Sequence, residues 1–419
     1  MKAVKSAIIV CDHAFVNGGQ AKVAIDTALA LRAKGLGVSV FCGVGPVDQR
    51  LIDAGVDCVC LNQFDLLGDP SRARSALRGL WNREAARRLR SLLSRFDPDE
   101  TIIHIHGWAK SLSPSIGPVI TAGPIPHVYT LHEYFLACPN GGFYDHHQQA
   151  ICTRRPLSRS CLVADCDPRN RAHKAWRVAR EALLWTAGTM PRALRDLIYL
   201  TETQLGAMRE YLPSSARLHH LPNPVARTVA GRVMAEENEV FLFIGRLSAE
   251  KGAEVAARAA QQAGVKIAFA GEGECKERVL AANPEALMLG WLKPDALQEW
   301  ISRARCLVFP SLWYEGLPMS VIEAMQRGLP ILVSDKSAAA ELVRHDIDGL
   351  HVAIGDMHAW ASAMRLMSVP ERVMRYSQSS LEASQDFLDP EAYGRQLLAI
   401  YQKAATAQRV ERLEKMRRH

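Results

Sequence analysis

Short apolar runs rich in β-branched residues alternate with helix-like stretches along most of this chain. The first series includes SAIIVCD, VSVFCGV, TIIHIHG and PHVYTLH. After LPNPV, a second series begins with EVFLFIGR and continues with VKIAFAGEG, RCLVFPS and LPILVSD. Such alternation predicts βαβ units and parallel sheets. Because 419 residues exceed what one hydrophobic core usually supports, we predict an α/β fold with two Rossmann-like domains.

The domain boundaries follow from the restart of this pattern after LPNPV. We predict an N-terminal Rossmann-like domain at 1–225 and a second one at 226–389, joined near 222–235. Residues 390–419 have the apolar spacing of a helix and end in a charged tail. This last segment can pack back on the N-terminal domain.

The composition, with 48% apolar and 23% charged residues, is that of an ordinary globular protein. No run approaches the roughly 20 apolar residues that span a bilayer, and Asp12 and His13 come too early for a signal peptide. We therefore expect a cytoplasmic protein. Residues 1–225 carry 27 Lys and Arg against 19 Asp and Glu, whereas the remainder carries 24 against 25. A basic first half predicts an anionic ligand or surface.

Several loops that follow predicted strands in the second half carry ligand-binding chemistry. Ligands of open α/β sheets bind beyond the carboxyl ends of the strands. Arg246 follows EVFLFIG and Lys251 comes five residues later, so two cations suited to a diphosphate stand at one strand end. The turn Gly271-Glu272-Gly273 follows VKIAFA and lets backbone approach a ligand, although a plain turn explains it equally well.

The segment FPSLWYEGLPMSVIEAM places two glutamates around a loop and a helix start. Gly316 and Pro318 shape a tight loop before the predicted helix, whose N-terminal N–H groups favour an anion. Glu323 lies where it can accept the hydroxyls of a ribose, and Glu315 lies where a transferred sugar would sit. Local capping or solvation would explain a lone pair of glutamates as well.

The motifs GRLSAEKG, AGEGE, LGWL and EGLPMSVIEAMQRGLPILVSD, in this order and spacing, resemble the donor domain of glycosyltransferase family 4. The resemblance covers nearly all of residues 240–350. It implies the GT-B fold, with two Rossmann-like domains facing a central cleft, and transfer from a nucleotide-diphosphate sugar with retention of anomeric configuration. It also implies roles for residues at the matching positions: Arg246 and Lys251 at the diphosphate, Glu323 at the ribose, Glu315 at the donor sugar, and Gly273, Gly316, Leu317 and Pro318 in the loops around the donor.

The first half supplies candidates for the facing side of that cleft. Gly18 and Gly19 lead directly into a predicted helix and resemble the family loop that closes over the donor phosphates. His132 ends the strand VYTL and resembles the histidine of the family's His-Asp element, with Glu133 in place of the aspartate. A structural histidine is the alternative. His104 and His106 alternate on a buried strand, so at most one of them faces the cleft.

Four cysteines, at 138, 152, 161 and 166, lie within 29 residues of each other. Their spacing lacks paired Cys-x2-Cys knuckles, so a structural zinc on Cys138, Cys152, Cys161 and Cys166 is one hypothesis and four free thiols are the other. No cofactor is expected for catalysis, because cations and helix N-termini can stabilise a leaving diphosphate.

The segment from Arg72 to Arg95 is basic and amphipathic, with eight arginines and one acid. A domain helix with a solvated arginine face explains it, and so does an edge that rests on an anionic membrane surface. The second interpretation suits a lipid-linked acceptor and a peripheral location on the inner face of the cytoplasmic membrane.

Three other classes of protein fit parts of the sequence. A metal-dependent, single-domain transferase needs an Asp-x-Asp element, and Asp97-Pro98-Asp99, Asp165-Cys166-Asp167 and Asp346-Ile347-Asp348 match that pattern. A noncatalytic module that binds nucleotide sugar or polysaccharide is the main alternative function. Nucleic-acid binding is not expected, because no zinc finger, aromatic RNA-binding motif or P-loop is present.

We predict a glycosyltransferase of surface polysaccharide biosynthesis acting on a glycan or lipid-linked acceptor.

Overall fold

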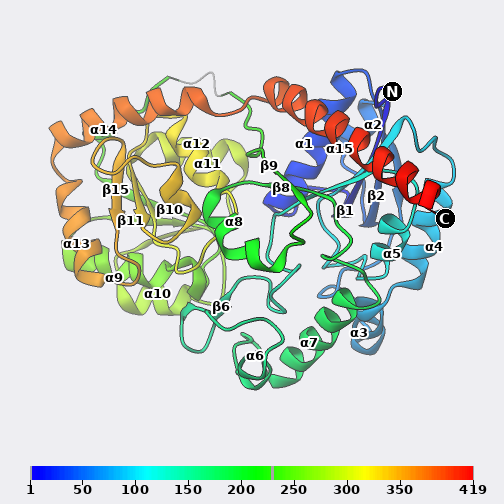
Figure 1. Ribbon diagram of the computed structural model, residues 1–419. Helices are drawn as coiled ribbons and strands as arrows, with labels where there is room; N and C mark the ends of the chain where they lie inside the picture. The colour runs from blue at the N-terminus through cyan, green and yellow to red at the C-terminus, as the bar shows by residue number, and fades with distance from the viewer. Residues whose placement is uncertain (1, 228–230, 419) are drawn as a thin grey trace.

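The computed structural model describes residues 2–227 and 231–418. Residues 228–230 of the predicted linker and the last residue of the predicted tail lie outside the described residues. Two parallel sheets dominate the molecule and lie side by side (Figure 1). The predicted α/β fold with two Rossmann-like domains is confirmed.

The N-terminal sheet has seven strands in the order β3-β2-β1-β4-β5-β8-β9, and every neighbouring pair is parallel. Its strands are β1 (Ser6–His13), β2 (Gly37–Val44), β3 (Asp57–Cys60), β4 (Thr101–Ile105), β5 (His127–Thr130), β8 (Asp196–Tyr199) and β9 (Arg217–His220). The C-terminal sheet has six parallel strands in the order β12-β11-β10-β13-β14-β15. Its strands are β10 (Val240–Ile244), β11 (Ile267–Ala270), β12 (Leu287–Gly290), β13 (Ala304–Phe309), β14 (Ile331–Ser334) and β15 (Gly349–Val352).

Helices cover both faces of each sheet. Those of the first half are α1 (Gly19–Ala33), α2 (Gln49–Asp53), α3 (Arg72–Leu80), α4 (Arg83–Leu93), α5 (Ile116–Thr121), α6 (Arg159–Val163), α7 (Arg171–Trp185) and α8 (Glu202–Met208). Those of the second half are α9 (Ala253–Ala263), α10 (Lys276–Ala282), α11 (Pro294–Ser302), α12 (Met319–Met325), α13 (Met357–Leu366), α14 (Pro370–Ala383) and α15 (Pro390–Arg418). Along β1, Ile8 and Val10 enter one core while Ile9 and Cys11 enter the other. Burial on both faces explains why the strands are continuous apolar runs.

The order of the strands reverses at one point in each sheet. In the N-terminal sheet this switch lies between β1 and β4, and in the C-terminal sheet it lies between β10 and β13. Loops that leave neighbouring strands in opposite directions open a crevice there, which is where open α/β sheets bind ligands. The loops after β1, β10 and β13 are those that contain Gly18, Arg246 and Glu315.

Helix α15 crosses from the C-terminal domain to the N-terminal sheet and lies beside α1 (Figure 1). The hydroxyl groups of Tyr393 and Thr27 are 2.9 Å apart. Leu397 and Tyr401 are buried in the same hydrophobic core as Ile9 of β1. The side chain of Gln402 accepts a hydrogen bond from the backbone N–H of Val4. The last helix is therefore part of the N-terminal domain.

The arginine-rich segment forms two helices, α3 and α4, where its apolar spacing suggested one. The break falls at Asn82, whose side chain accepts a hydrogen bond from the N–H of Ala85 and so caps α4. Leu89 is buried, whereas Leu77 on α3 is 71% exposed. Within 2–227 and 231–418, none of the helices combines the length and the apolar character needed to cross a bilayer.

Candidate active site

A buried ion pair joins the loops that follow β10 and β13. Lys251 Nζ lies 2.8 and 2.7 Å from the two carboxylate oxygens of Glu315, and it also lies 5.4 Å from the ring centroid of Trp313. Glu315 is only 5% exposed and has a positive φ of 61°. Left-handed backbone at a non-glycine residue costs free energy and is concentrated at functional sites. From the sequence we expected Lys251 at the diphosphate and Glu315 at the donor sugar, and the structure pairs the two side chains with each other.

Arg246 lies at the mouth of the same crevice. Its guanidinium donates to the buried carboxylate of Glu250 over 2.8 Å, and 62% of its side chain is exposed. Ser248 also donates to Glu250. Glu250 therefore orients Arg246 while leaving most of the cation accessible to an anionic ligand.

Glu323 lies in the second turn of α12 and has a raised pKa. Burial is the main cause, and the cation of Lys22 on α1 opposes it. Lys22 is paired with Asp26 of its own helix at 2.8 Å. Glu323 thus lies within electrostatic reach of the other domain, as a ligand held between the domains would require. Pro318 is the N-cap of α12, so the helix N-terminus opens onto the loop of Gly316.

The remaining predicted donor residues have different environments. Gly18 and Gly19 begin α1 with no heavy atom within 4 Å of the position that a side chain would take. Gly273 has a φ of 156°, and a Cβ there would lie 2.3 Å from the carbonyl oxygen of Leu247, so neighbouring backbone already requires this glycine. The side chain of Leu317 is buried in a small apolar cluster between the domains. Its backbone alone is left for a ligand.

Histidines form a connected row behind the N-terminal side of the crevice. His132 Nε2 lies 2.9 Å from His106 Nδ1, and the rings of His106 and His104 are 4.0 Å apart. His104 is held by the hydroxyls of Tyr401 and Thr130, at 2.7 and 2.6 Å. Burial lowers the pKa of His132 to about 3, so its imidazole is neutral at pH 7. His104 is thus a structural residue, whereas His106 contacts His132, the predicted site residue, directly.

Contacts across the crevice fix the two halves of the site relative to each other. Tyr134 donates its hydroxyl hydrogen to the backbone carbonyl of Glu315. A Cβ on Gly316 would lie 3.1 Å from the carbonyl oxygen of His132. The structure therefore brings His132, Glu315 and Gly316 to one place, with Lys251 bound to Glu315.

Sequence reasoning missed three residues of this site. Ser311 donates to the Glu315 carboxylate, Tyr134 holds the Glu315 backbone, and Lys22 faces Glu323. Ser311 and Tyr134 both follow predicted strands within five residues, which is a signal that could have found them. Lys22 lies inside a helix and carries no such signal.

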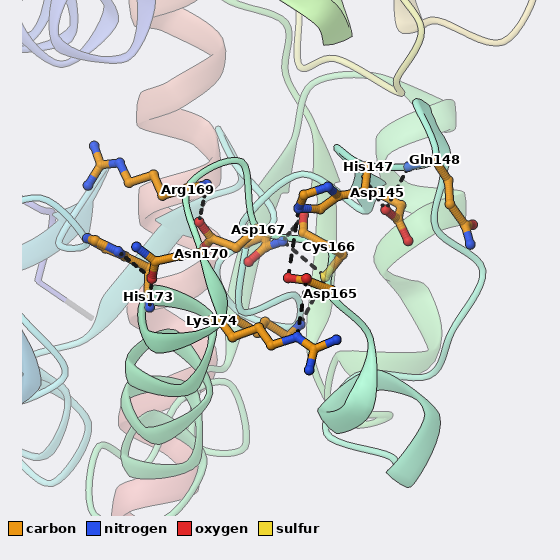
Figure 2. A network of polar contacts seen from close by, with 12 residues as sticks. Asp145, His147, Gln148, Asp165, Cys166, Asp167, Arg169, Asn170, His173 and Lys174 are labelled. Atoms are coloured by element: carbon orange, nitrogen blue, oxygen red, sulfur yellow. Dashed lines mark hydrogen bonds and ion pairs between the residues drawn. The ribbon is translucent and has the colours of Figure 1, made fainter.

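The four clustered cysteines lie in the segment between β5 and β8. Lys174 and Cys166 lie next to each other (Figure 2), with 3.1 Å between Lys174 Nζ and Cys166 Sγ. Lys174 Nζ also lies 3.7 Å from Cys161 Sγ, and Asn140 donates to Cys166. In the described part of the chain, no three His, Cys, Asp or Glu side chains are gathered as metal ligands. A structural zinc on these cysteines stays a prediction, and the lysine ammonium next to two of the sulfurs weighs against it.

The three Asp-x-Asp sequences are engaged by basic side chains. Asp97 and Asp99 precede β4, and Asp346 and Asp348 precede β15. These four aspartates therefore lie at the N-terminal ends of the strands, whereas the candidate site lies at the C-terminal ends. The ion pairs are Asp97–Lys2, Asp99–Arg412, Asp165–Arg171, Asp167–Arg177, Asp346–Arg372 and Asp348–Arg344. Together with the two-domain fold, their placement argues against the single-domain transferase class.

Comparison with known families assigns both halves of the chain. The family described as Glycosyltransferase Family 4 matches residues 17–228, and the one described as Glycosyl transferases group 1 matches residues 238–368. The chain belongs to glycosyltransferase family 4. The resemblance seen in the motifs of the second half is thereby confirmed, and it extends through the N-terminal domain.

Curated relatives of this family 4 chain match it over shorter stretches. An uncharacterized glycosyltransferase of Methanocaldococcus jannaschii is 28% identical over 127 residues, which is 28% of this chain and 32% of the relative. A lipopolysaccharide 1,2-N-acetylglucosaminetransferase of Salmonella typhimurium is 29% identical over 138 residues, which is 29% of this chain and 36% of the relative. The chain thus matches about a third of the length of these curated relatives.

Solved structures share the fold over nearly the whole chain. Sucrose-phosphate synthase from Thermosynechococcus elongatus has a TM-score of 0.65 at 16% identity and covers 96% of this chain and 100% of its own. Anabaena HepE, solved in complex with UDP, has a TM-score of 0.64 at 14% identity and covers 94% of this chain and 98% of its own. At these identities the likeness shows the fold, which is the expected GT-B arrangement.

Proposed function

We propose that this chain transfers a sugar from a nucleotide-diphosphate donor to a glycan or lipid-linked acceptor. One observation carries the proposal: loops at the switch points of two parallel sheets hold two cations, two helix N-termini and a buried carboxylate, and Tyr134 of the first domain contacts Glu315 of the second. The cations are Arg246 and Lys251, the helices are α1 and α12, and the carboxylate is Glu315. Membership of glycosyltransferase family 4 supports the same conclusion.

The residues at the crevice suit the departure of a nucleotide diphosphate. Cleavage of the bond to the anomeric carbon leaves negative charge on the phosphate, and preorganised donors aimed at that charge lower the barrier. Arg246 and Lys251 supply cations, while the N–H groups at the starts of α1 and α12 supply dipoles. Glu323 accepts the ribose hydroxyls in this proposal, and its charged form gains hydrogen bonds when the nucleotide binds.

His132 orients the transferred sugar in this proposal. Its pKa of about 3 makes protonated imidazole scarce at pH 7, so the ring acts as a neutral hydrogen-bond partner. Its Nε2 is engaged with His106, which leaves Nδ1 for a sugar hydroxyl. By analogy with the family, the acceptor attacks the face from which the nucleotide leaves, and the anomeric configuration is retained.

The acceptor belongs to surface polysaccharide assembly in this proposal, and it reaches the chain at a membrane. Relatives named for lipopolysaccharide and amylovoran biosynthesis support that assignment. The exposed arginines of α4 would contact the anionic surface, with the roughly 1 kcal/mol per cation typical of such contacts. Sedimentation with anionic liposomes tests this contact, and binding unaltered after Arg83, Arg87, Arg88 and Arg90 become Glu would contradict it.

A thermal-shift panel of UDP-, GDP- and ADP-sugars tests the donor site. A donor present at 100 times its dissociation constant should stabilise the chain by about 2.7 kcal/mol. Lys251→Ala should abolish that stabilisation. The matched control is Lys266→Ala. Lys266 also pairs with a glutamate, but it directly precedes β11 and so lies at the N-terminal ends of the strands, away from the candidate site. Equal stabilisation of both variants would refute the assignment of the site.

A further inference from the structure

A cavity of about 790 Å³ lies in the N-terminal domain between α3, α7 and the loops that follow β4 and β5. Helices α3 and α7 lie side by side there (Figure 1), and the indole N–H of Trp176 donates to the carbonyl of Ala76 across them. One acidic side chain, Asp65, lines the cavity. The basic side chains that line it are Arg72, Lys110, Arg169, Arg177 and Arg180.

Most of this positive charge is not neutralised by the protein. Arg177 pairs with Asp167 at 3.0 Å, and Lys110 lies 3.7 Å from Glu133. Among residues 2–227 and 231–418, the other three arginines have no carboxylate partner. Figure 2 shows Arg169 extending away from the network around Cys166. The cavity therefore has a net positive charge that a ligand anion can balance.

Arg180 is the most informative of these cations, because it is only 3% exposed. Its guanidinium lies 5.6, 4.9 and 5.0 Å from the ring centroids of Trp108, Phe135 and Trp176. One N–H group donates to the carbonyl of Ala109, but Nε has no partner in the described part of the protein. A buried charge is costly unless it is paired. An unpaired buried guanidinium on a cavity wall thus indicates that an anion binds there.

Among the described residues no carboxylate forms an ion pair with Arg180, although Glu181, Asp12 and Glu133 are near enough to favour its charged form. Burial raises the pKa of Glu181 to about 8, so this side chain is mostly protonated at pH 7. It accepts a hydrogen bond from the indole of Trp185 over 2.8 Å. Arg180 keeps its charge, because burial lowers its pKa only to about 10.

The cavity adjoins the N-terminal side of the candidate active site. Lys110 follows β4, its backbone N–H donates to Asp12 at the end of β1, and Glu133 beside it follows His132. Apolar side chains are exposed on the same part of the surface: Leu67, which lines the cavity, is 58% exposed, and Leu77 of α3 is 71% exposed. A cationic interior beside exposed apolar side chains suits a ligand with an anionic head and a hydrocarbon tail.

We propose that this cavity binds the phosphate or diphosphate of a lipid-linked acceptor, whose hydrocarbon chain leaves past Leu67 and Leu77. The proposal rests on the proposed function, since it names the acceptor of the same reaction. The phosphate group lies against Arg72, Arg169 and Arg180, and the sugar attached to it extends toward His132.

Binding of farnesyl diphosphate to the full chain, measured by titration calorimetry, tests the proposal. The donor site is first saturated with the nucleoside diphosphate that stabilises the chain most. Replacing both Arg72 and Arg169 with Gln should raise the dissociation constant by a factor of about 10 or more, since charge-assisted hydrogen bonds are lost. The control replaces Arg365 and Arg375 with Gln, two exposed arginines of α13 and α14 outside the cavity, and should leave binding unchanged.

Two comparison ligands identify the source of the phosphate. Farnesol should not bind, and inorganic pyrophosphate should bind more weakly than farnesyl diphosphate. Pyrophosphate binding as tightly as the lipid would overturn the lipid assignment, and equal binding by both double variants would overturn the cavity itself. If a nucleoside diphosphate still stabilises the chain in that case, the proposed function stands. Absence of any nucleotide effect would instead contradict the proposed function.

Discussion

The pairing of Lys251 with Glu315 makes a quantitative prediction. The Glu315 side chain is 6% exposed and the Lys251 side chain 22% exposed, so the pair is largely removed from water. Removing one partner of a buried pair costs about 3–5 kcal/mol, because it leaves a buried charge uncompensated. The partial exposure of Lys251 favours the lower end of this range. Lys251→Ala should therefore reduce the free energy of unfolding of the C-terminal domain by about 3 kcal/mol.

The companion variants separate the pair from its surroundings. Glu315→Gln should cost about 1–2 kcal/mol, since an amide can still accept from Ser311 and the lysine can reach water. The double variant should cost about 2 kcal/mol less than the sum of the single changes, because it leaves no buried charge without a partner. Lys266→Ala is the control: both side chains of its pair with Glu239 are exposed, so loss of the pair should have little effect on stability.

Urea unfolding with a readout confined to the C-terminal domain is the appropriate measurement. A two-domain chain need not unfold in one step, so amide hydrogen exchange in β13 and α12 should accompany the optical signal. Strictly additive single changes would refute the reasoning. A loss for Lys251→Ala no larger than that for Lys266→Ala would refute it as well.

Three further predictions concern other residues. Glu323→Gln should abolish stabilisation by the preferred nucleotide sugar in thermal-shift measurements, whereas Glu299→Gln on the exposed face of α11 should not. The folded chain raises the pKa of Glu181 from 4.5 to about 8, so the stability contributed by this group is complete below pH 4.5 and is lost as the pH rises to about 8. Glu181→Gln should flatten that decline in urea unfolding series, and an unchanged pH profile would contradict the burial argument. Atomic absorption of protein purified without chelators should find much less than one zinc per chain, because Lys174 repels a dication next to Cys166. One zinc per chain would contradict this expectation and support a metal site on the four cysteines.

Local sequence signals were sufficient for the strands and for the loops of the candidate site. Apolar runs bounded by glycine and polar residues place β1, β10 and β13, and residues directly after them do reach the crevice. The helix break at Asn82 was also predictable in principle, because asparagine is a preferred N-cap residue and Asn82 directly precedes the helix-forming run Arg-Glu-Ala-Ala. The amphipathic spacing across Asn82 obscured it.

Partners that are distant in the sequence were not predictable in this way. Lys251 and Glu315 are 64 positions apart and meet only because β10 and β13 are neighbours in the sheet. His104 looked like a possible cleft residue, yet its partner Tyr401 comes from a helix 297 residues later. The lysine beside Cys166 likewise has no signature in the cysteine spacing. Each of these contacts depends on how elements pack rather than on local pattern.

The return of α15 to the first sheet has a consequence for engineering new specificities. The C-terminal domain is tethered at both of its ends, by the segment after β9 and by the segment before α15, so it behaves as a module inserted into the N-terminal domain. Grafting a relative's C-terminal domain onto this protein thus calls for two junctions, and a chimera cut once near residue 225 would exchange Tyr401 and remove the native support of His104.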